Sequence, residues 1–241
     1  MRILGIESSS LVASVALVTD DVLTAEYTMN FKKTHSQTLL PMLDEIANML
    51  ELDLNTIDAI AVAAGPGSFT GLRIGSATGK GLGLALKKPL IHIPTVDAMA
   101  YNLYGCPDLI CPIMDARRKQ VYTGIYRYED HRLVTVKDQM AVGIEELLSM
   151  LNEMGETVTF LGDGVPVFKD IIADKLEVPF SFAPAHLSRQ RAGAVGALGV
   201  LYYKEGRTET AAEHKPDYLR VSQAERERAQ KLKKESEGEK A

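Results

Sequence analysis

Short apolar runs alternate along this chain with longer stretches of helical periodicity. Three β-rich runs come first, and a helical stretch follows in which apolar residues recur at i, i+3/i+4 and i+7. The first half of the chain then continues with a near-continuous apolar run and a glycine-rich helical stretch. It ends with a short apolar run and a further helical stretch. The expected strands are 2–7, 12–19, 22–30, 57–64 and 89–93, and the expected helices are 35–50, 69–87 and 95–104.

The second half of the chain repeats this order at an offset of about 107 residues. Both halves have the order strand–strand–strand–helix–strand–helix–strand–helix. Such an alternation predicts an α/β protein in which each half forms a mixed sheet with helices on its faces. The expected strands of the second half are 109–115, 120–128, 132–137, 157–162 and 178–182, and its expected helices are 143–154, 165–175 and 188–204.

The duplicated order resembles the two-lobed, ribonuclease H-like fold of the actin, Hsp70 and sugar-kinase superfamily (ASKHA). In that fold, ligands bind between the lobes, beside the first hairpin of each. We therefore expect an N-terminal actin-like lobe at 1–104 and a C-terminal actin-like lobe at 105–222. Residues 223–241 have no apolar face and nearly balanced charge, so we expect a frayed helix or a disordered tail there.

The composition narrows the possible classes of protein. The chain has 241 residues and a formal net charge of −5, which argues against a protein that grips a nucleic acid backbone by itself. No apolar stretch approaches the ~20 residues that a membrane span needs. The N-terminus lacks the apolar core of a signal peptide, and the two cysteines have no CxxC spacing. We expect a cytoplasmic protein that does not associate with membranes.

Four glycines recur at every fourth residue of the expected helix 69–87 and form a ridge with almost no side chains. Each glycine inside a helix costs ~1 kcal/mol against alanine, and only the close approach of another backbone recovers that energy. The neighbour is either an element of the same lobe or a helix of another chain, and we favour another chain, with helix 35–50 completing the surface. The residues expected at this partner interface are His35, Leu39, Met42, Ile46, Gly71, Arg73, Gly75, Ser76, Gly79 and Gly83.

The first hairpin of the N-terminal half carries polar residues that are candidates for a binding cleft. Glu7 ends the first strand, and Ser8, Ser9 and Ser10 follow it. In the kinase and ATPase relatives of the superfamily an acidic residue at this place positions a metal or a water, and serines can offer amides and hydroxyls to an oxyanion. The alternative is a polar turn whose serines satisfy their own backbone.

The matching hairpin of the C-terminal half holds Asp115, Arg117 and Arg118 directly after a buried strand. The arginines are suited to bidentate binding of a phosphate or of a partner's carboxylate. The alternative is an Asp–Arg pair that closes a tight turn. Both interpretations stay open at the level of the sequence.

Other catalytic motifs are not legible in the sequence. The five histidines show no HxxH, HxxxH or HExxH spacing, so they predict no metal site, and they form no recognisable Ser–His–Asp set. The segment "GSATGKG" is not a P-loop, because Ile74 and Gly81 stand where GxxxxGK[ST] requires a glycine and a hydroxyl residue.

Several motifs together resemble the bacterial TsaB (YeaZ) family. They are "ILGIESSS", "HSQTLLPMLDEI", "GPGSFTGLRIG", "DARRKQVY" and "KPDYLR", and the resemblance covers residues 1–222. It implies a role in making threonylcarbamoyladenosine at position 37 of tRNAs that read ANN codons. It further implies a non-catalytic subunit without a cofactor, which binds the catalytic paralogue TsaD together with the P-loop ATPase TsaE and meets tRNA only through that complex.

This chain differs from TsaD-type chains at the positions of their metal ligands. TsaD-type chains carry a metal-binding HxxxH pair after the strand that corresponds to "KPLI", and here Thr95 and Met99 take those positions. A hydroxyl and a thioether make a poor iron or zinc site compared with two imidazoles. The resemblance also implies that the chain forms a homodimer when alone, through the face that meets TsaD. An older protease label for the family has no support in these residues.

An enzymatic alternative from the same superfamily is an ATP-binding phosphotransferase. The duplicated hairpins and Glu7 favour it. The second hairpin, "MDARRKQ", argues against it, because it lacks the glycine-rich turn that usually admits phosphate.

Overall fold

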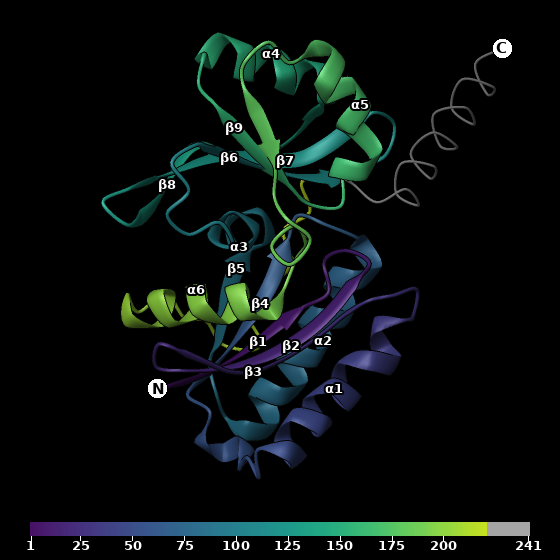
Figure 1. Ribbon diagram of the computed structural model, residues 1–241. Helices are drawn as coiled ribbons and strands as arrows, with labels where there is room; N and C mark the ends of the chain where they lie inside the picture. Colours follow the sequence, from purple (N-terminus) through teal and green to yellow (C-terminus); the bar gives the residue numbers. More distant parts are fainter. Residues whose placement is uncertain (221–241) are drawn as a thin grey trace, which may run out of the picture.

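Two five-stranded sheets with the same topology form the frame of the computed structural model, which describes residues 1–220 (Figure 1). In each half the first three strands pair antiparallel, the fourth pairs parallel with the first, and the fifth pairs parallel with the fourth. The predicted duplication of an α/β unit is confirmed. The first sheet has the order β3 (Val22–Asn30), β2 (Val12–Thr19), β1 (Arg2–Glu7), β4 (Ala59–Gly65) and β5 (Leu90–Pro94). The second has the order β8 (Arg132–Gly143), β7 (Gln120–Glu129), β6 (Leu109–Asp115), β9 (Val158–Leu161) and β10 (Phe180–Phe182).

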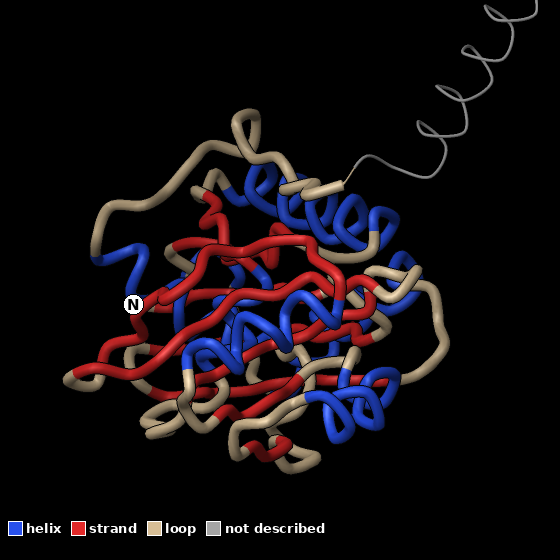
Figure 2. Tube along the Cα trace, turned by 90° about the horizontal axis from the view of Figure 1, so that it is seen from above, coloured by secondary structure: helices blue, strands red, loops and turns tan. Residues whose placement is uncertain are grey.

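Helices lie outside each sheet and between the two sheets (Figure 1). α1 and α2 cover the outer face of the first sheet, α4 and α5 cover the outer face of the second, and α3 and α6 lie between them. Seen from above, the strands occupy the middle of the molecule and loops run around its rim (Figure 2). The helices are α1 (His35–Met49), α2 (Phe69–Leu86), α3 (Thr95–Tyr101), α4 (Ile144–Met154), α5 (Val165–Lys175) and α6 (Ala192–Lys204), with a short 3-10 helix η1 (Leu54–Thr56).

The burial of the strands follows from this layering. All seven residues of β4 are buried, because helices cover both faces of the first sheet. Successive residues of β1 alternate between the two faces: Leu4 packs in the core beneath α1 and α2, and Ile3 packs in the core beneath α6. β3 lies at the edge of the sheet and is mostly exposed.

The third helix of each half packs in the layer between the sheets, so packing contacts cross the predicted boundary at residue 104. α6 belongs to the predicted lobe 105–222, but it packs on β1, β2 and β4 of the first sheet. Glycines allow this close approach: a Cβ atom on Gly196 would lie 2.8 Å from Cγ2 of Val18, and one on Gly199 would lie 2.7 Å from Cβ of Ala61. α3, from the predicted lobe 1–104, packs against β6 and β7 as well as against α6. A division at residue 104 therefore does not separate two packing units.

The largest differences from the predicted element boundaries lie in β8 and α6. β8 continues to Gly143 because it pairs with β7 as far as Gln120, whereas the prediction ended this strand at 137. α6 begins at Ala192 and not at 188, since Arg191 has an extended backbone and the Ala192 amide donates to Ser14 Oγ at 3.0 Å.

No helix within residues 1–220 has the length and apolar character to cross a lipid bilayer. The tail expected at 223–241 lies outside the described residues.

Candidate functional site

The glycine ridge of α2 faces its own sheet. Gly71, Gly75, Gly79 and Gly83 are all buried. A Cβ atom on Gly79 would lie 2.6 Å from Cγ2 of Val62, and Cβ atoms on the first two glycines would clash with Ser8. The expectation that this ridge meets another chain is therefore wrong. The missing side chains let α2 lie directly on β1, β4 and β5, and packing within the lobe offsets the low helix propensity.

Most of the other residues predicted for the partner interface are also buried inside the lobe. Leu39, Met42 and Ile46 belong to the core beneath α1, because the apolar stripe of an amphipathic helix turns toward the sheet. His35 is buried with its Nε2 2.8 Å from the carbonyl oxygen of Ser10, and Ser76 is buried too. Arg73 is the exposed member of the predicted set, with its guanidinium over the ring of Phe69.

The outward faces of the same two helices enclose an apolar groove of about 500 Å³, which we call the α1–α2 groove. Leu40, one of its lining residues, is 53% exposed, and Leu84, three residues after Gly81 on α2, is 70% exposed. A Cβ atom on Gly81 would meet nothing within 4 Å. In the sequence, the recurrence of small and apolar residues on the outer side of α2, including Ile74, was the pattern that could have predicted this groove. The groove is lined by His35, Ser36, Leu39, Leu40, Ile74, Ala77, Thr78, Gly81 and Leu82.

A second cavity of about 520 Å³, which we call the interlobe cleft, lies between the first hairpins of the two halves. The structure thus brings together residues that the sequence placed at both hairpins. From the first half come the β1–β2 turn and the start of α2, and from the second half come the end of β6 and the turn after β9. Lining residues from the two sides include Ser9, Ser10, Thr70, Asp115, Arg117 and Asp163.

Two carboxyl groups at this cleft have raised pKa values because they are largely buried. Glu7 is 1% exposed, and its Oε1 accepts a hydrogen bond of 2.6 Å from the amide of Ser9. Burial raises the pKa of Glu7 to about 7, against that hydrogen bond, and the charge of Asp163 adds to the rise. Burial also raises the pKa of Asp163, whose Oδ1 accepts from Gln190 Nε2 at 2.9 Å.

The serines after β1 use most of their polar groups inside the lobe. Ser8 Oγ donates to the carbonyl oxygen of Gly71 at 2.9 Å, the amide of Ser9 is bound by Glu7, and Ser10 Oγ accepts from the amide of Val12. Ser9 Oγ is buried and has no hydrogen-bond partner within residues 1–220. The turn therefore has few donors to offer an oxyanion.

Asp115 and Arg117 close the β6–β7 turn. The backbone amide and Nη1 of Arg117 donate to the two carboxylate oxygens of Asp115, at 2.8 and 3.1 Å. Arg117, Arg118 and Lys119 all have positive φ angles, of 64°, 56° and 56°, a conformation that residues with a side chain adopt at a cost of roughly 1–2 kcal/mol each. The three cationic side chains are exposed, and Arg117 borders the interlobe cleft.

Thr95 and Met99, for which the resemblance implies lost metal ligands, lie in the core. Thr95 is fully buried, and its Oγ1 accepts from the amide of Gly65 at 3.2 Å. Met99 packs among the buried side chains beneath the second sheet, close to Leu161. Neither side chain is directed as a ligand into the interlobe cleft.

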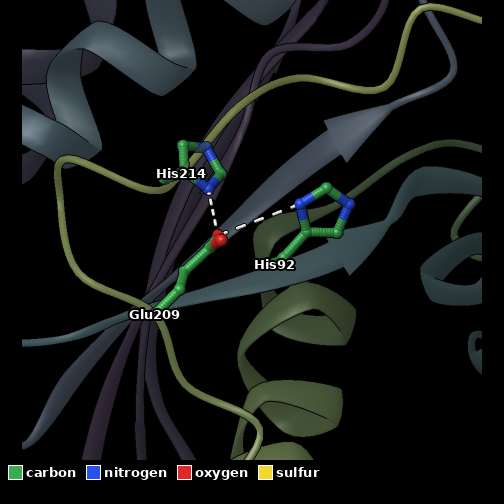
Figure 3. Close-up of side chains that lie close together, drawn as sticks. All are labelled: His92, Glu209 and His214. Atoms are coloured by element: carbon green, nitrogen blue, oxygen red, sulfur yellow. Dashed lines mark hydrogen bonds and ion pairs between the residues drawn. The ribbon is translucent and has the colours of Figure 1, made fainter.

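A group of ionisable residues that no sequence motif connects lies where the segment after α6 pairs with β5. His92 of β5 approaches Glu209 and His214, and the ligand atoms of the three side chains lie within 4.8 Å of one another (Figure 3). The sequence separation from His92 hid this cluster, because metal-site patterns in a sequence rely on short spacings.

Comparison of the sequence with known proteins shows which family the chain resembles. Residues 25–228 match the family model described as "TsaD: tRNA N6-adenosine threonylcarbamoyltransferase". The tRNA threonylcarbamoyladenosine biosynthesis protein TsaB of Bacillus subtilis is 35% identical over 225 residues, which cover 93% of this chain and 96% of that protein. TsaB of Escherichia coli is 33% identical over 176 residues, which cover 71% of this chain and 75% of that protein.

A solved structure shows the same fold. YeaZ from Pseudomonas aeruginosa superposes with a TM-score of 0.78 at 23% identity, covering 90% of this chain and 99% of that one. The agreement in fold extends through both halves, and the agreement in sequence with TsaB of Bacillus subtilis extends over nearly the whole of both proteins. The chain therefore belongs to the TsaB family of tRNA threonylcarbamoyladenosine biosynthesis proteins.

Proposed function

We propose that this protein is a non-catalytic subunit of the cytoplasmic machinery that makes threonylcarbamoyladenosine at position 37 of ANN-decoding tRNAs. In this role it binds and organises a TsaD-type catalytic paralogue, a TsaE-type ATPase joins the pair, and tRNA is met only through the complex. The observation that carries the proposal is the α1–α2 groove, an uncovered apolar surface on a member of the TsaB family.

The chemistry of the groove suits a helix of a partner chain. Small residues, Ala77 and Gly81, let another backbone approach closely, and the exposed side chain of Leu40 offers apolar area in the groove. Clustered exposed apolar side chains on a soluble domain mark interaction sites. We assign the same groove to a homodimer when the paralogue is absent, so that the two assemblies exclude each other.

The polar residues beside the interlobe cleft support an accessory role. Glu7 is buried with a raised pKa, Ser8 Oγ is bound to the carbonyl oxygen of Gly71, and Asp115 is paired with Arg117. Thr95 and Met99 lie in the core in place of the paralogue's metal ligands.

The test is a substitution that fills the groove and leaves the fold intact. Gly81→Leu adds bulk where a Cβ atom meets nothing, and it replaces a helical glycine by a better helix former. We expect it to weaken binding to the TsaD-type paralogue at least tenfold in calorimetry, with an unchanged circular dichroism spectrum. Ala173→Leu, an exposed position on α5 of the other lobe, is the matched control and should bind normally.

Equal affinities of both variants and the unsubstituted protein would remove the groove from the proposed interface. The homodimer is tested on the same proteins by sedimentation. Gly81→Leu should be monomeric at concentrations where Ala173→Leu is dimeric.

An ATP-binding phosphotransferase is the second candidate, and the meeting of Glu7, Asp115 and Asp163 around the interlobe cleft favours it. The residues fit a nucleotide poorly, because Ser8 Oγ, the amide of Ser9 and Ser10 Oγ are already hydrogen-bonded within the protein and the β6–β7 turn lacks the glycines that usually admit phosphate. Calorimetry of the single chain with Mg-ATP decides between the two candidates. Micromolar binding with turnover would favour the kinase.

A further inference from the structure

The cluster of His92, Glu209 and His214 is built on paired backbone. His92 belongs to β5, and Glu209 forms two backbone hydrogen bonds of 2.9 Å with Leu90 of the same strand. The carboxylate of Glu209 lies between the two imidazole rings (Figure 3). Its Oε1 is 2.6 Å from Nδ1 of His214 and 3.9 Å from Nδ1 of His92.

The second nitrogen of His92 is held by another carboxylate. Nε2 of His92 lies 2.8 Å from Oδ2 of Asp217. Metal-binding histidines characteristically donate their second ring nitrogen to a carboxylate, which fixes the tautomer and aims the free lone pair at the metal. Asp217 itself is anchored, because its amide donates to the carbonyl oxygen of Ala64 at 2.7 Å.

Burial and access are also suitable for a bound cation. The side chain of His214 is fully buried, so its position next to Glu209 is fixed by packing. His92 and Glu209 are partly exposed and leave a path from solvent. Two cations of the described chain lie nearby: Lys80 of α2, whose Nζ donates to the carbonyl oxygen of His214 at 3.0 Å, and Arg207, whose charge acts on His92.

We propose that His92, Glu209 and His214 bind one divalent transition-metal ion of the Zn²⁺ type, with a fourth position open to solvent. Two imidazole nitrogens and one carboxylate form a ligand set that zinc accepts in tetrahedral geometry. With metal–ligand bonds of about 2.0–2.2 Å, the ligand atoms of a tetrahedron stand about 3.3 Å apart. The 2.6 Å contact would open and the 3.9 Å contact would close, each by less than about 1 Å.

Proton balance at His214 is simple. In the metal-free protein the N–H group at Nδ1 of His214 donates a hydrogen bond to the carboxylate of Glu209. Metal binding at Nδ1 transfers that proton to Nε2, so the ring stays neutral. Nε2 has no hydrogen-bond partner in the described part of the chain, so the exchange breaks no bond there.

The ion would fasten a segment that contacts both lobes. We call residues 206–220 the C-terminal strap. It pairs with β5 at Glu209, crosses the end of β4 at Asp217 and reaches the β6–β7 turn, where Nη1 of Arg220 donates to the carbonyl oxygen of Ala116 at 2.6 Å. A metal at His92 and Glu209 ties the start of this strap to the first sheet.

The experiment measures Zn²⁺ binding by the untagged full-length protein after treatment with a chelator. Calorimetry should show one equivalent of Zn²⁺ bound, and Co²⁺ should give the visible absorption of a tetrahedral site. His92→Gln and Glu209→Gln should each weaken Zn²⁺ binding at least tenfold, as should Asp217→Asn, which alters only the carboxylate that orients His92. His186→Gln, at an exposed histidine away from the cluster, is the matched control and should bind normally.

The far-ultraviolet spectrum and thermal midpoint of each chelated variant report whether it folds, and the partly exposed His92, Glu209 and Asp217 are chosen for that reason over the buried His214. Lack of stoichiometric Zn²⁺ binding by the unsubstituted protein would overturn the proposal. Equal Zn²⁺ affinity of the three cluster variants and the control would overturn it too.

Discussion

Glu7 shows how a single residue in this fold makes stability depend on pH. Its carboxyl group ends β1 in a fully buried position, and desolvation raises its pKa from 4.5 to about 7. The folded protein therefore binds a proton at Glu7 in a pH range where the unfolded chain has lost it. Stability from this group is present below pH 4.5 and is lost as the pH rises toward 7.

Glu7→Gln should flatten this decline. Glutamine keeps an acceptor for the amide of Ser9 and does not ionise, so the variant should gain stability relative to the unsubstituted protein as the pH rises from 4.5 to 7. The shift in pKa corresponds to roughly 3 kcal/mol at full ionisation. Urea unfolding of both proteins across this pH range is the measurement, and parallel stability curves would contradict the assignment.

The glycines of α2 allow a second prediction for single residues. Replacement of glycine by alanine should have opposite effects on stability on the two sides of the helix. Gly79→Ala places a methyl group against Val62 and should destabilise the protein by about 1–3 kcal/mol. Gly81→Ala meets open space and should stabilise it by about 0.5–1 kcal/mol. Urea midpoints that move in the same direction for both variants would show that the packing of α2 is described wrongly.

At the scale of elements, α6 is the helix whose position decides the architecture. Its N-terminus is bound by Glu26 of β3, which accepts hydrogen bonds from the amide of Gly193 at 2.8 Å and from the guanidinium of Arg191. A carboxylate at a helix N-terminus also interacts favourably with the helix dipole. This contact joins two elements that lie more than 160 residues apart in the chain.

Glu26→Gln should therefore loosen α6 on the first sheet. Loss of the charge weakens both the ion pair and the helix cap, and we expect destabilisation of about 1–3 kcal/mol. Glu145→Gln is the control, because its ion pair with Lys175 is solvent-exposed and contributes little. Hydrogen exchange should accelerate in α6 of the first variant alone. Unchanged exchange there would show that Glu26 does not hold the helix.

At the scale of the whole molecule, the two halves complete each other. Ile3, Val18, Ala61 and Ile91 of the first sheet form one core with α6, which comes from the second half. The predicted lobe 1–104 lacks the helix that covers this face. The lobes are therefore duplicated in topology but not independent in packing.

Residues 1–104 produced alone should fold incompletely. The uncovered face of the first sheet would expose apolar side chains to water, so the fragment should bind a hydrophobic dye and unfold without a sharp transition. Adding residues 192–220 through a flexible linker should restore a cooperative thermal transition, measured by circular dichroism. A cooperative transition of 1–104 by itself would restore the boundary that the sequence suggested.

Local patterns in the sequence determined the strands, the helices and their duplicated order, because periods of 2 and 3.6 residues are properties of short stretches. The polar residues Glu7, Asp115 and Arg117 were likewise placed at the two hairpins, and the structure brings those hairpins to one cleft. Tertiary structure alone decided that the glycine ridge meets its own sheet, that α6 covers the opposite half, and that His92 approaches Glu209 and His214. Each of these depends on which surfaces pair across long separations in the chain, and a bare helix face is equally suited to a neighbour in the same lobe or in another molecule.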